Sequence, residues 1–250
     1  MDLNFFSKAF WLQFSSPKTF YPVAGKLIPW CGFLALILTL CGLYLGFFTT
    51  PKLAGDQKEY YHIIFIHVPA AWMSMLIYFV MGVYALLGFV LNARLSAMMA
   101  SALAPTGAMF TVIALWTGAL WGRPAWGTYW EWDPRLTSEL VLLFLYLGFI
   151  SLQAVIPDVR RAIRAGALLA IVGVVFLPII YFSVNLNTIH QASRIVVGET
   201  MPASVFTAMI VMVLAFWVYS IMVALMRVRA VILEQEKRAA WTEVLGHQNG

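Results

Sequence analysis

The segment FIHVPAAWMSMLIYFVMGVYALLGFVL, residues Phe65 to Leu91, contains no Asp, Glu, Lys or Arg and decides the class of this protein. A helix needs roughly 20 apolar residues to cross the hydrocarbon core of a bilayer, and this segment exceeds that length. The rest of the chain is similar, because its 250 residues are 62% hydrophobic and only 11% charged, with a mean hydropathy of +0.84. Soluble domains have about 25% charged residues. The composition therefore predicts a membrane protein and argues against a soluble or a nucleic-acid-binding one.

Charge-free runs of this kind occur six times and predict an all-α membrane protein with six transmembrane helices. The expected spans are residues 30–48, 65–91, 103–121, 140–156, 165–184 and 203–226. The fourth span is the shortest, because only the 18 residues between Glu139 and Asp158 lack charge. We expect residues 1–250 to form a single polytopic membrane domain, with no room for a separate soluble module.

The distribution of Lys and Arg predicts which side of the membrane each loop occupies. Eleven of the 16 basic residues fall in the two termini and the even-numbered loops, and five fall in the odd-numbered loops. Cytoplasmic loops carry the excess of basic residues in membrane proteins. We therefore expect both termini to be cytoplasmic, and the loops at residues 49–64, 122–139 and 185–202 to face outward.

The second of these outward loops carries the most unusual composition in the chain. Its surroundings read WTGALWGRPAWGTYWEWDPRLTSE from Trp116 to Glu139 and hold five of the ten tryptophans. Aromatic residues at a membrane surface commonly form a belt, but a belt spreads over several helices. Concentrated in one loop with helix-breaking glycines and prolines, they predict a flat aromatic platform for a large planar apolar ligand. A packed structural loop remains the alternative reading of the residues themselves.

Two histidines lie on the same side of the membrane as this loop. His67 is near the outer end of the second span, and His190 follows the fifth span. Each alone is more typical of a hydrogen-bonded interfacial histidine. Two imidazoles beside an aromatic platform fit the axial ligands of haem iron, with arginines available for the propionates. A zinc site is less well supported, because the sequence lacks a suitable ligand spacing, and His62 is interpreted as a rim residue.

The tract WGTYWEWDPRLTSELVLLFLYLG, Trp126 to Gly148, closely resembles the WWD signature of bacterial haem-handling proteins. Together with six spans, IIFIHVPAAW before the signature and LPIIYFSVNLNTIHQ after it, the chain resembles the CcmC (haem exporter protein C) family of cytochrome c maturation. The resemblance covers about residues 30–238. It implies that His67 and His190 are axial ligands of the iron of non-covalently bound haem b. The implied haem-contacting residues are Trp126, Tyr129, Trp130, Trp132 and Asp133. The chemistry of the residues themselves adds Trp121, Arg123 and Arg135 as candidate haem contacts, with Arg135 the first choice for a propionate.

The same resemblance implies a location and a set of partners. In the family, the outward loop presents haem to the periplasmic chaperone CcmE, at the bacterial inner membrane. The implied companions are the ATP-binding cassette pair CcmA and CcmB and the single-span protein CcmD. The sequence itself has no phosphate-binding loop, because Gly25-Lys26 is followed by Leu27 and lacks the upstream glycine. We therefore expect a haem-delivery protein without ATPase activity of its own, and no catalytic residue.

Three other functions compete with haem delivery. A membrane b-type cytochrome in quinol electron transfer would place its histidines within spans, whereas both histidines here are expected at span ends. A channel or permease subunit would carry polar or charged residues inside its spans, which the span boundaries above exclude. Haem-thioether synthases of the same superfamily are larger and contain additional histidines.

Overall fold

The computed structural model describes residues 16–51, 59–186, 201–237, 239 and 241–242. Six of its helical segments are long and apolar enough to span a membrane, and the described part of the chain is all helical apart from turns and short connections. The six-span, all-α prediction is confirmed. The helices are α2 (Pro17–Tyr44), α3 (Ile64–Leu91), α4 (Arg94–Trp126), α5 (Pro134–Val155), α6 (Val159–Val174), α7 (Phe176–Leu186) and α8 (Ala203–Gln235). A π-helical turn, η1 (Leu45–Thr49), extends α2, and a 3-10 turn, η2 (Glu59–Ile63), precedes α3.

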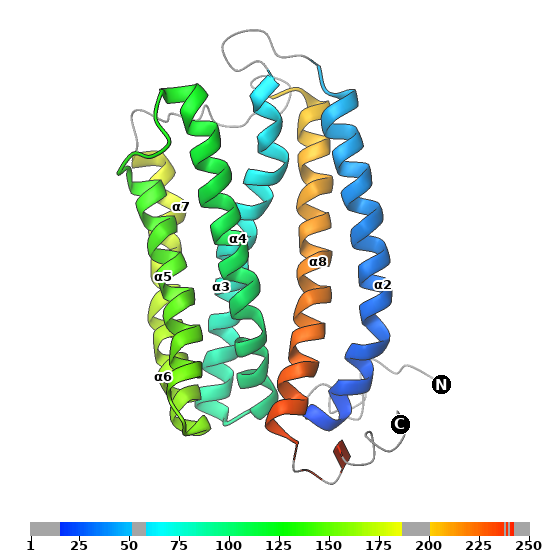
Figure 1. The fold of residues 1–250 in the computed structure, drawn as a ribbon, viewed down its shortest axis with the longest axis vertical. Coiled ribbons are helices and arrows are strands. Elements are labelled where there is room, and N and C mark those ends of the chain that lie inside the picture. Colours follow the sequence, from blue (N-terminus) through cyan, green and yellow to red (C-terminus); the bar gives the residue numbers. More distant parts are fainter. Residues whose placement is uncertain (1–15, 52–58, 187–200, 238, 240, 243–250) are drawn as a thin grey trace.

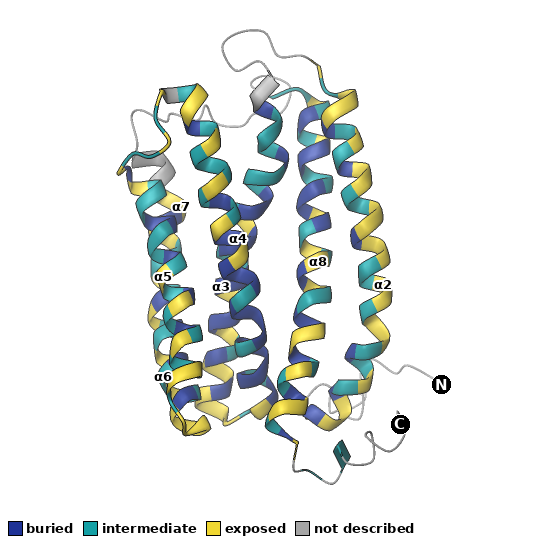
Figure 2. Cartoon of the chain, viewed as in Figure 1, coloured by how far each residue is buried: buried dark blue, intermediate teal, exposed yellow. Residues whose placement is uncertain are grey.

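The helices form one elongated bundle (Figure 1). α3 and α4 pack closely along the centre, with α5, α6 and α7 on one side and the α2 and α8 pair on the other. Burial follows this arrangement: 67% of the most apolar stretch of α4 is buried, against 17% for α2 (Figure 2). From Leu27 onward the exposed residues of α2 are apolar, as expected of a helix that faces lipid.

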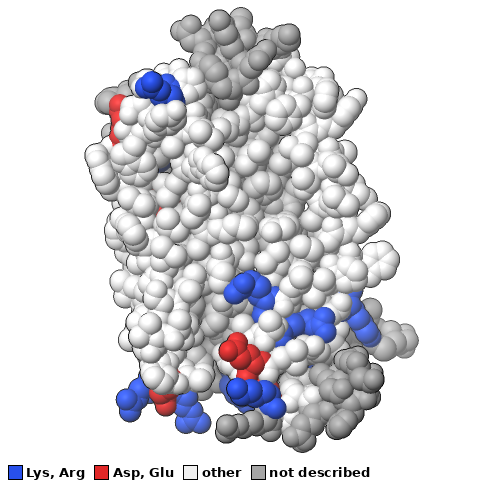
Figure 3. All heavy atoms as spheres, viewed as in Figure 1, with Lys and Arg blue, Asp and Glu red and all other residues white. Residues whose placement is uncertain are grey.

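The two ends of the bundle differ in composition. We call the end that carries residues 127–133, between α4 and α5, the aromatic end. The opposite end, where α2 begins and α8 ends, we call the basic end, and most of the Lys and Arg side chains visible in Figure 3 lie toward it. This distribution agrees with the predicted cytoplasmic side for the described ends of the chain.

Several helices begin or end beyond the spans expected from charge-free runs. α4 begins at Arg94 rather than Leu103, and it continues through Gly122 to Trp126. α5 begins at Pro134, so residues 134–139 are helical rather than part of the loop. The loop expected at residues 122–139 is therefore only residues 127–133. The expected start of α4 was wrong although residues 95–102 carry no charge, whereas the expected loop was too long because helix ends accommodate charged residues such as Arg123 and Arg135.

Local sequence explains where the aromatic-end helices stop and start. The α4 helix ends at Gly127, which adopts a left-handed φ of 84° and donates its N–H to the Arg123 carbonyl. Asp133 caps the next helix by accepting a 2.7 Å hydrogen bond from the Leu136 N–H, and Pro134 occupies the first helical position.

The last span before α8 is broken between α6 and α7. Pro178 cannot donate a backbone hydrogen bond to the carbonyl four residues earlier, and the break falls at Val175, next to that carbonyl. Helix packing elsewhere depends on small residues: a side chain at Gly107 would clash with Tyr146, and one at Gly173 would clash with Tyr78. These two tyrosines meet edge to face, with ring centroids 4.9 Å apart.

Candidate functional site at the aromatic end

His67 is held at the aromatic end against the last turns of α4. The residue lies in the first turn of α3, and its Nδ1 is 3.0 Å from the Thr117 hydroxyl oxygen. Its ring meets the Trp121 ring edge to face, with centroids 5.7 Å apart and planes at 82°. A Cβ at Gly118 would lie 3.1 Å from His67 Cε1, so the missing side chain permits the close approach. Three residues of one helix therefore fix the imidazole.

The Thr117 hydroxyl determines which nitrogen of His67 carries the proton. Its oxygen lies 2.6 Å from the Ile113 carbonyl, to which it donates its single proton. Toward His67 the hydroxyl can then only accept, so Nδ1 carries the proton of the neutral imidazole. Nε2 is left with a lone pair, which is the form in which imidazole binds a metal. A hydrogen bond from the other ring nitrogen is the usual support of such a ligand.

Two indole N–H groups at the aromatic end are buried without a hydrogen-bond partner in the described part of the chain. They belong to Trp121 and Trp130. A buried polar group without a partner costs about 1–3 kcal/mol, so such groups are uncommon away from functional sites. Both donors suit a ligand that brings acceptor atoms, and the carboxylates of haem propionates are acceptors of this kind. The residues present at the aromatic end therefore fit haem.

The aromatic residues between α4 and α5 do not form one flat surface. The rings of Trp130 and Trp132 meet edge to face, with centroids 5.3 Å apart and planes at 80°. The expectation of a flat platform is thus wrong for this pair, because edge-to-face packing is the more favourable geometry for two adjacent rings. A planar ligand could lie on one ring only while meeting the edge of the other. Trp132 is 77% exposed and Tyr129 56% exposed, so both are accessible.

The two candidate arginines differ in how far the protein already uses them. Arg123 is exposed, donates to the Gly127 carbonyl, and lies with its guanidinium carbon 5.5 Å from the centre of the Tyr129 ring. Arg135 is half-buried in the first turn of α5, within electrostatic range of both Asp133 and His67. Its position beside the imidazole makes Arg135 the better placed of the two for a carboxylate of a ligand bound at His67.

Asp133 has a structural task in this site. It is 7% exposed, and its side chain caps α5, as described above. The same residue also accepts the Thr137 N–H through its backbone carbonyl, at 3.0 Å. Asp133 thereby fixes the start of the helix that carries Arg135.

Some of the predicted site residues cannot be placed. His190 lies outside the described residues, and for Trp126 the structure describes the backbone but not the side chain. His62 lies in η2, with its ring stacked on Phe47 at 5.1 Å between centroids and close to Tyr61 at 4.1 Å. It therefore packs toward η1, whereas His67 packs on α4. Across the described ranges, no group of three His, Cys, Asp or Glu residues could hold a metal ion.

The sequence analysis missed Glu139. It was expected at the border between the loop and the fourth span, but the residue lies inside α5 and is only 8% exposed. Its Oε1 accepts a 2.7 Å hydrogen bond from the Ser74 hydroxyl on α3. The spans therefore do contain a charged residue type, contrary to the expectation, because the helix start at Pro134 carries Glu139 more than one turn into the helix. Glu139 follows Arg135 by four residues, which places both on one face of a helix. This spacing was the available signal that Glu139 belongs to the helix.

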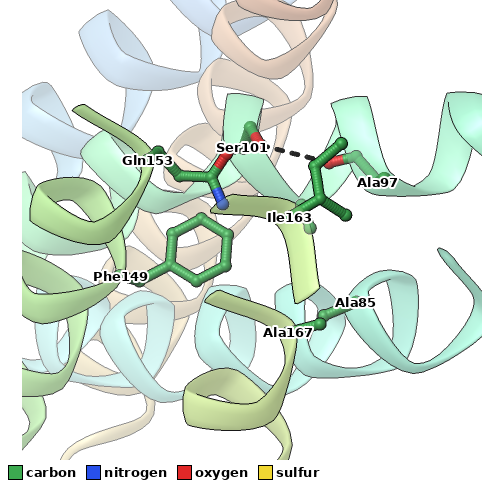
Figure 4. Close-up of a pocket in the computed structure, with 8 residues that line it drawn as sticks. Ala85, Ala97, Ser101, Phe149, Gln153, Ile163 and Ala167 are labelled. Carbon is green, nitrogen blue, oxygen red and sulfur yellow. Dashed lines mark hydrogen bonds between the residues drawn. The ribbon is translucent and has the colours of Figure 1, made fainter. Parts of the chain in front are cut away.

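A small pocket lies between α3, α4, α5 and α6 near the basic end (Figure 4). Its polar lining consists of Ser101 and Gln153, and the Gln153 amide donates to the Ala162 carbonyl at 3.0 Å. The remaining lining residues are alanines, Ile163 and Phe149. Without an imidazole or a cation, this pocket lacks the groups that would hold haem.

Comparison with known proteins identifies the family. The family model described as "Heme exporter protein C" matches residues 10–243, which is nearly the whole chain. The chain belongs to the CcmC family. This result confirms the resemblance seen in the WWD tract and in the segments around both histidines.

Individual members of the CcmC family match along almost their full length. Heme exporter protein C of Escherichia coli strain K12 is 43% identical over 234 residues, which cover 93% of this chain and 95% of the relative. The protein of the same name from Bradyrhizobium diazoefficiens is 40% identical, over 91% of this chain and 87% of the relative. That from Haemophilus influenzae is 36% identical, over 94% and 97%.

Proposed function

We propose that this protein binds haem at the aromatic end and delivers it to a periplasmic haem chaperone, CcmE, during cytochrome c maturation. Family membership supports haem handling, and the observation that carries the proposal is the state of His67. Its Nδ1 lies 3.0 Å from the Thr117 hydroxyl, and we propose that Nε2 binds the iron. His190 is proposed as the second axial ligand, which would complete the coordination of the iron.

Each described residue has a defined part in this mechanism. Thr117, Gly118 and Trp121 orient His67, while Asp133 fixes the helix that presents Arg135 to a propionate. The buried indole N–H groups of Trp121 and Trp130 supply donors for the ligand's acceptor atoms. Exposed Tyr129 and Trp132 extend the contact surface toward the chaperone. None of these residues needs to act as an acid or a base, because bond formation takes place on the chaperone.

The proposal extends to location and partners. The excess of Lys and Arg at the basic end supports a cytoplasmic position for that end at a bacterial inner membrane, and we propose that the aromatic end and its haem face the periplasm. We propose that CcmA and CcmB supply ATP hydrolysis, which this chain has no motif to perform, and that CcmD completes the complex. The bound haem is haem b, held without a covalent bond until it reaches the chaperone.

The test compares four purified proteins after expression with and without CcmE. Wild type and His62→Ala should contain haem with a low-spin, bis-histidine absorption spectrum, whereas His67→Ala and His67→Ala/His190→Ala should lose this spectrum. Covalent haem on CcmE should fall in the same two variants. An unaltered spectrum in the double variant contradicts the proposed ligands, and unaltered loading of CcmE contradicts the proposed delivery. The quinol oxidation rate of the wild type tests the b-type cytochrome alternative.

A further inference from the structure

Glu139 is a buried carboxyl group within a membrane-spanning helix, and haem binding as proposed above does not use it. Its side chain bonds to Ser74 Oγ, and Ser74 is completely buried. The Tyr146 hydroxyl donates to the Ser74 backbone carbonyl at 2.7 Å, so the same short stretch of α3 receives two contacts from α5. Ionisable residues at such depth are expensive and commonly functional.

No cation neutralises this carboxyl group within the part of the chain that the structure describes. The ion pair found there joins Arg94 to Glu236 at the basic end, far along the bundle from Glu139. Arg135 precedes Glu139 by one helical turn but does not form an ion pair with it. An ionised carboxylate without a cation in an apolar interior is strongly disfavoured. The group therefore needs either a proton or a positive charge brought by a ligand.

The hydrogen bonds around Ser74 have room for one additional proton. The Ser74 hydroxyl has one proton but two acceptors, the Glu139 carboxyl oxygen at 2.7 Å and the Ala71 carbonyl at 2.8 Å. If Glu139 is ionised, the two acceptors compete for that proton. If Glu139 is a carboxylic acid, it donates to Ser74 Oγ while Ser74 donates to Ala71, and both acceptors are satisfied. The cluster can thus exist with or without the proton, with only a hydroxyl rotation between the two states.

The proposed iron ligand, His67, lies on the same face of α3 as Ser74. His67 and Ser74 are seven residues apart, or two helical turns, which is about 10 Å along the helix. Ferric iron in a porphyrin carries one net positive charge, and ferrous iron carries none. A unit charge at roughly 10 Å, with an effective dielectric constant of about 20, alters an ionisation equilibrium roughly tenfold. The oxidation state of the iron can therefore influence Glu139.

We propose that Glu139 is a proton-binding site that takes up a proton when the haem iron at His67 is reduced and releases it when the iron is oxidised. The ratio of protonated to ionised carboxyl is about tenfold higher while the iron is ferrous than while it is ferric. A one-electron donor, which is the electrode in the test below, reduces ferric to ferrous iron, and a solvent proton (H3O+) converts the Glu139 carboxylate to the acid, so charge and atoms balance. This inference rests on the proposed haem site.

Few other titratable groups surround this carboxyl group. α3 contributes His67 and Tyr78, and α5 contributes Arg135 and Tyr146. α4, α6 and α7 contain no Asp, Glu, His or Lys. A proton taken up on haem reduction would therefore go to Glu139 or to a haem propionate near Arg135. The experiment must separate these two acceptors.

The test uses the haem-loaded full chain in lipid nanodiscs, reduced at an electrode and followed by absorption at several pH values. In wild type, the equilibrium constant for reduction should fall about tenfold as pH rises through the ionisation of Glu139. In Glu139→Gln, which keeps a hydrogen-bonding partner for Ser74, that fall should be absent while the bis-histidine spectrum remains. An equal pH dependence in both proteins overturns the proposal.

Infrared difference spectra give a second test that needs no variant. Ferrous-minus-ferric spectra of wild type should contain a carboxylic-acid C=O band that shifts when glutamate is labelled with ¹³C, which distinguishes a glutamate side chain from unlabelled propionates. Absence of a glutamate band overturns the proposal even if Glu139→Gln fails to fold. Failure of the haem site itself is recognised earlier, because the wild type would then lack the bis-histidine spectrum, and that outcome also removes the basis of the proposal.

Discussion

The two ends of the bundle differ in how fully their polar groups are paired within the protein. At the basic end, Glu236 pairs with Arg94 at 2.9 Å and accepts the Trp241 indole N–H at 2.8 Å, and Arg227 Nε donates to the Ala102 carbonyl. Arg229 has one buried nitrogen without a partner, but its guanidinium carbon lies 4.2 Å from the centre of the Tyr21 ring. This end is largely satisfied by the protein itself.

At the aromatic end, the protein supplies donors that it does not use. Trp121 and Trp130 have buried indole N–H groups without partners among the described residues, and His67 has one nitrogen assigned to Thr117 and the other available. The difference indicates that the basic end is built for stability and topology, whereas the aromatic end is built to be completed by a ligand. Substitutions at the two ends should therefore separate haem binding from folding.

The largest separable effect is expected for Thr117→Val, which removes the hydrogen-bond partner of His67 Nδ1. Losing the group that orients a metal-bound histidine typically lowers affinity about 10- to 100-fold, and we expect a loss of that size in haem affinity. The matched control is Thr111→Val on the same helix, where the hydroxyl bonds only to the Gly107 carbonyl. Haem titrations of both proteins measure the difference. Equal haem affinities for the two variants would show that Thr117 does not orient His67 for binding the iron.

Arg135→Gln should be next, with haem affinity falling about tenfold or more. A hydrogen bond to a charged group contributes about 1.5–3 kcal/mol, and the half-buried Arg135 lies near His67. Arg123→Gln is the control and should have the smaller effect, because its guanidinium is exposed and already donates to Gly127. The same titration, repeated with haem whose propionates are esterified, should abolish the difference between wild type and Arg135→Gln. A persistent difference would contradict propionate binding.

The sequence predicted the six spans because apolar length and charge are properties of the chain itself. The same criterion placed Glu139 at a span border, and its burial depends on how α5 turns toward Ser74, which no single-helix pattern specifies. His67 was selected because its predicted position is on the same side of the membrane as the WWD tract, and the structure brings it to Trp121. The role of Thr117 could not be predicted, because a threonine within an apolar helix usually bonds only to its own backbone. The 80° angle between Trp130 and Trp132 is likewise a tertiary property.

A smaller effect is expected for Trp121→Phe and Trp130→Phe, which remove the indole N–H and part of the ring. Haem affinity should fall several-fold, since each variant loses a donor to the ligand. The haem-free protein should lose little stability from the missing N–H, because that group has no partner without the ligand. Trp72→Phe, on an exposed site of α3, is the control. Haem titration and thermal unfolding of the haem-free proteins provide the two measurements; unchanged affinity in both variants would mean that the indoles do not donate to haem.

The smallest effect should come from the other end of the molecule, with Arg94→Gln. Arg94 is 68% exposed although its partner Glu236 is 7% exposed, so solvent weakens the pair and its contribution to stability should be about 1 kcal/mol or less. Glu236 keeps the Trp241 indole N–H as a hydrogen-bond donor in this variant. Haem affinity should not change, because nothing at the basic end contacts the proposed site. A loss of haem in Arg94→Gln with unaltered thermal unfolding would mean that the two ends are coupled, and the division between a stabilising end and a binding end would then be wrong.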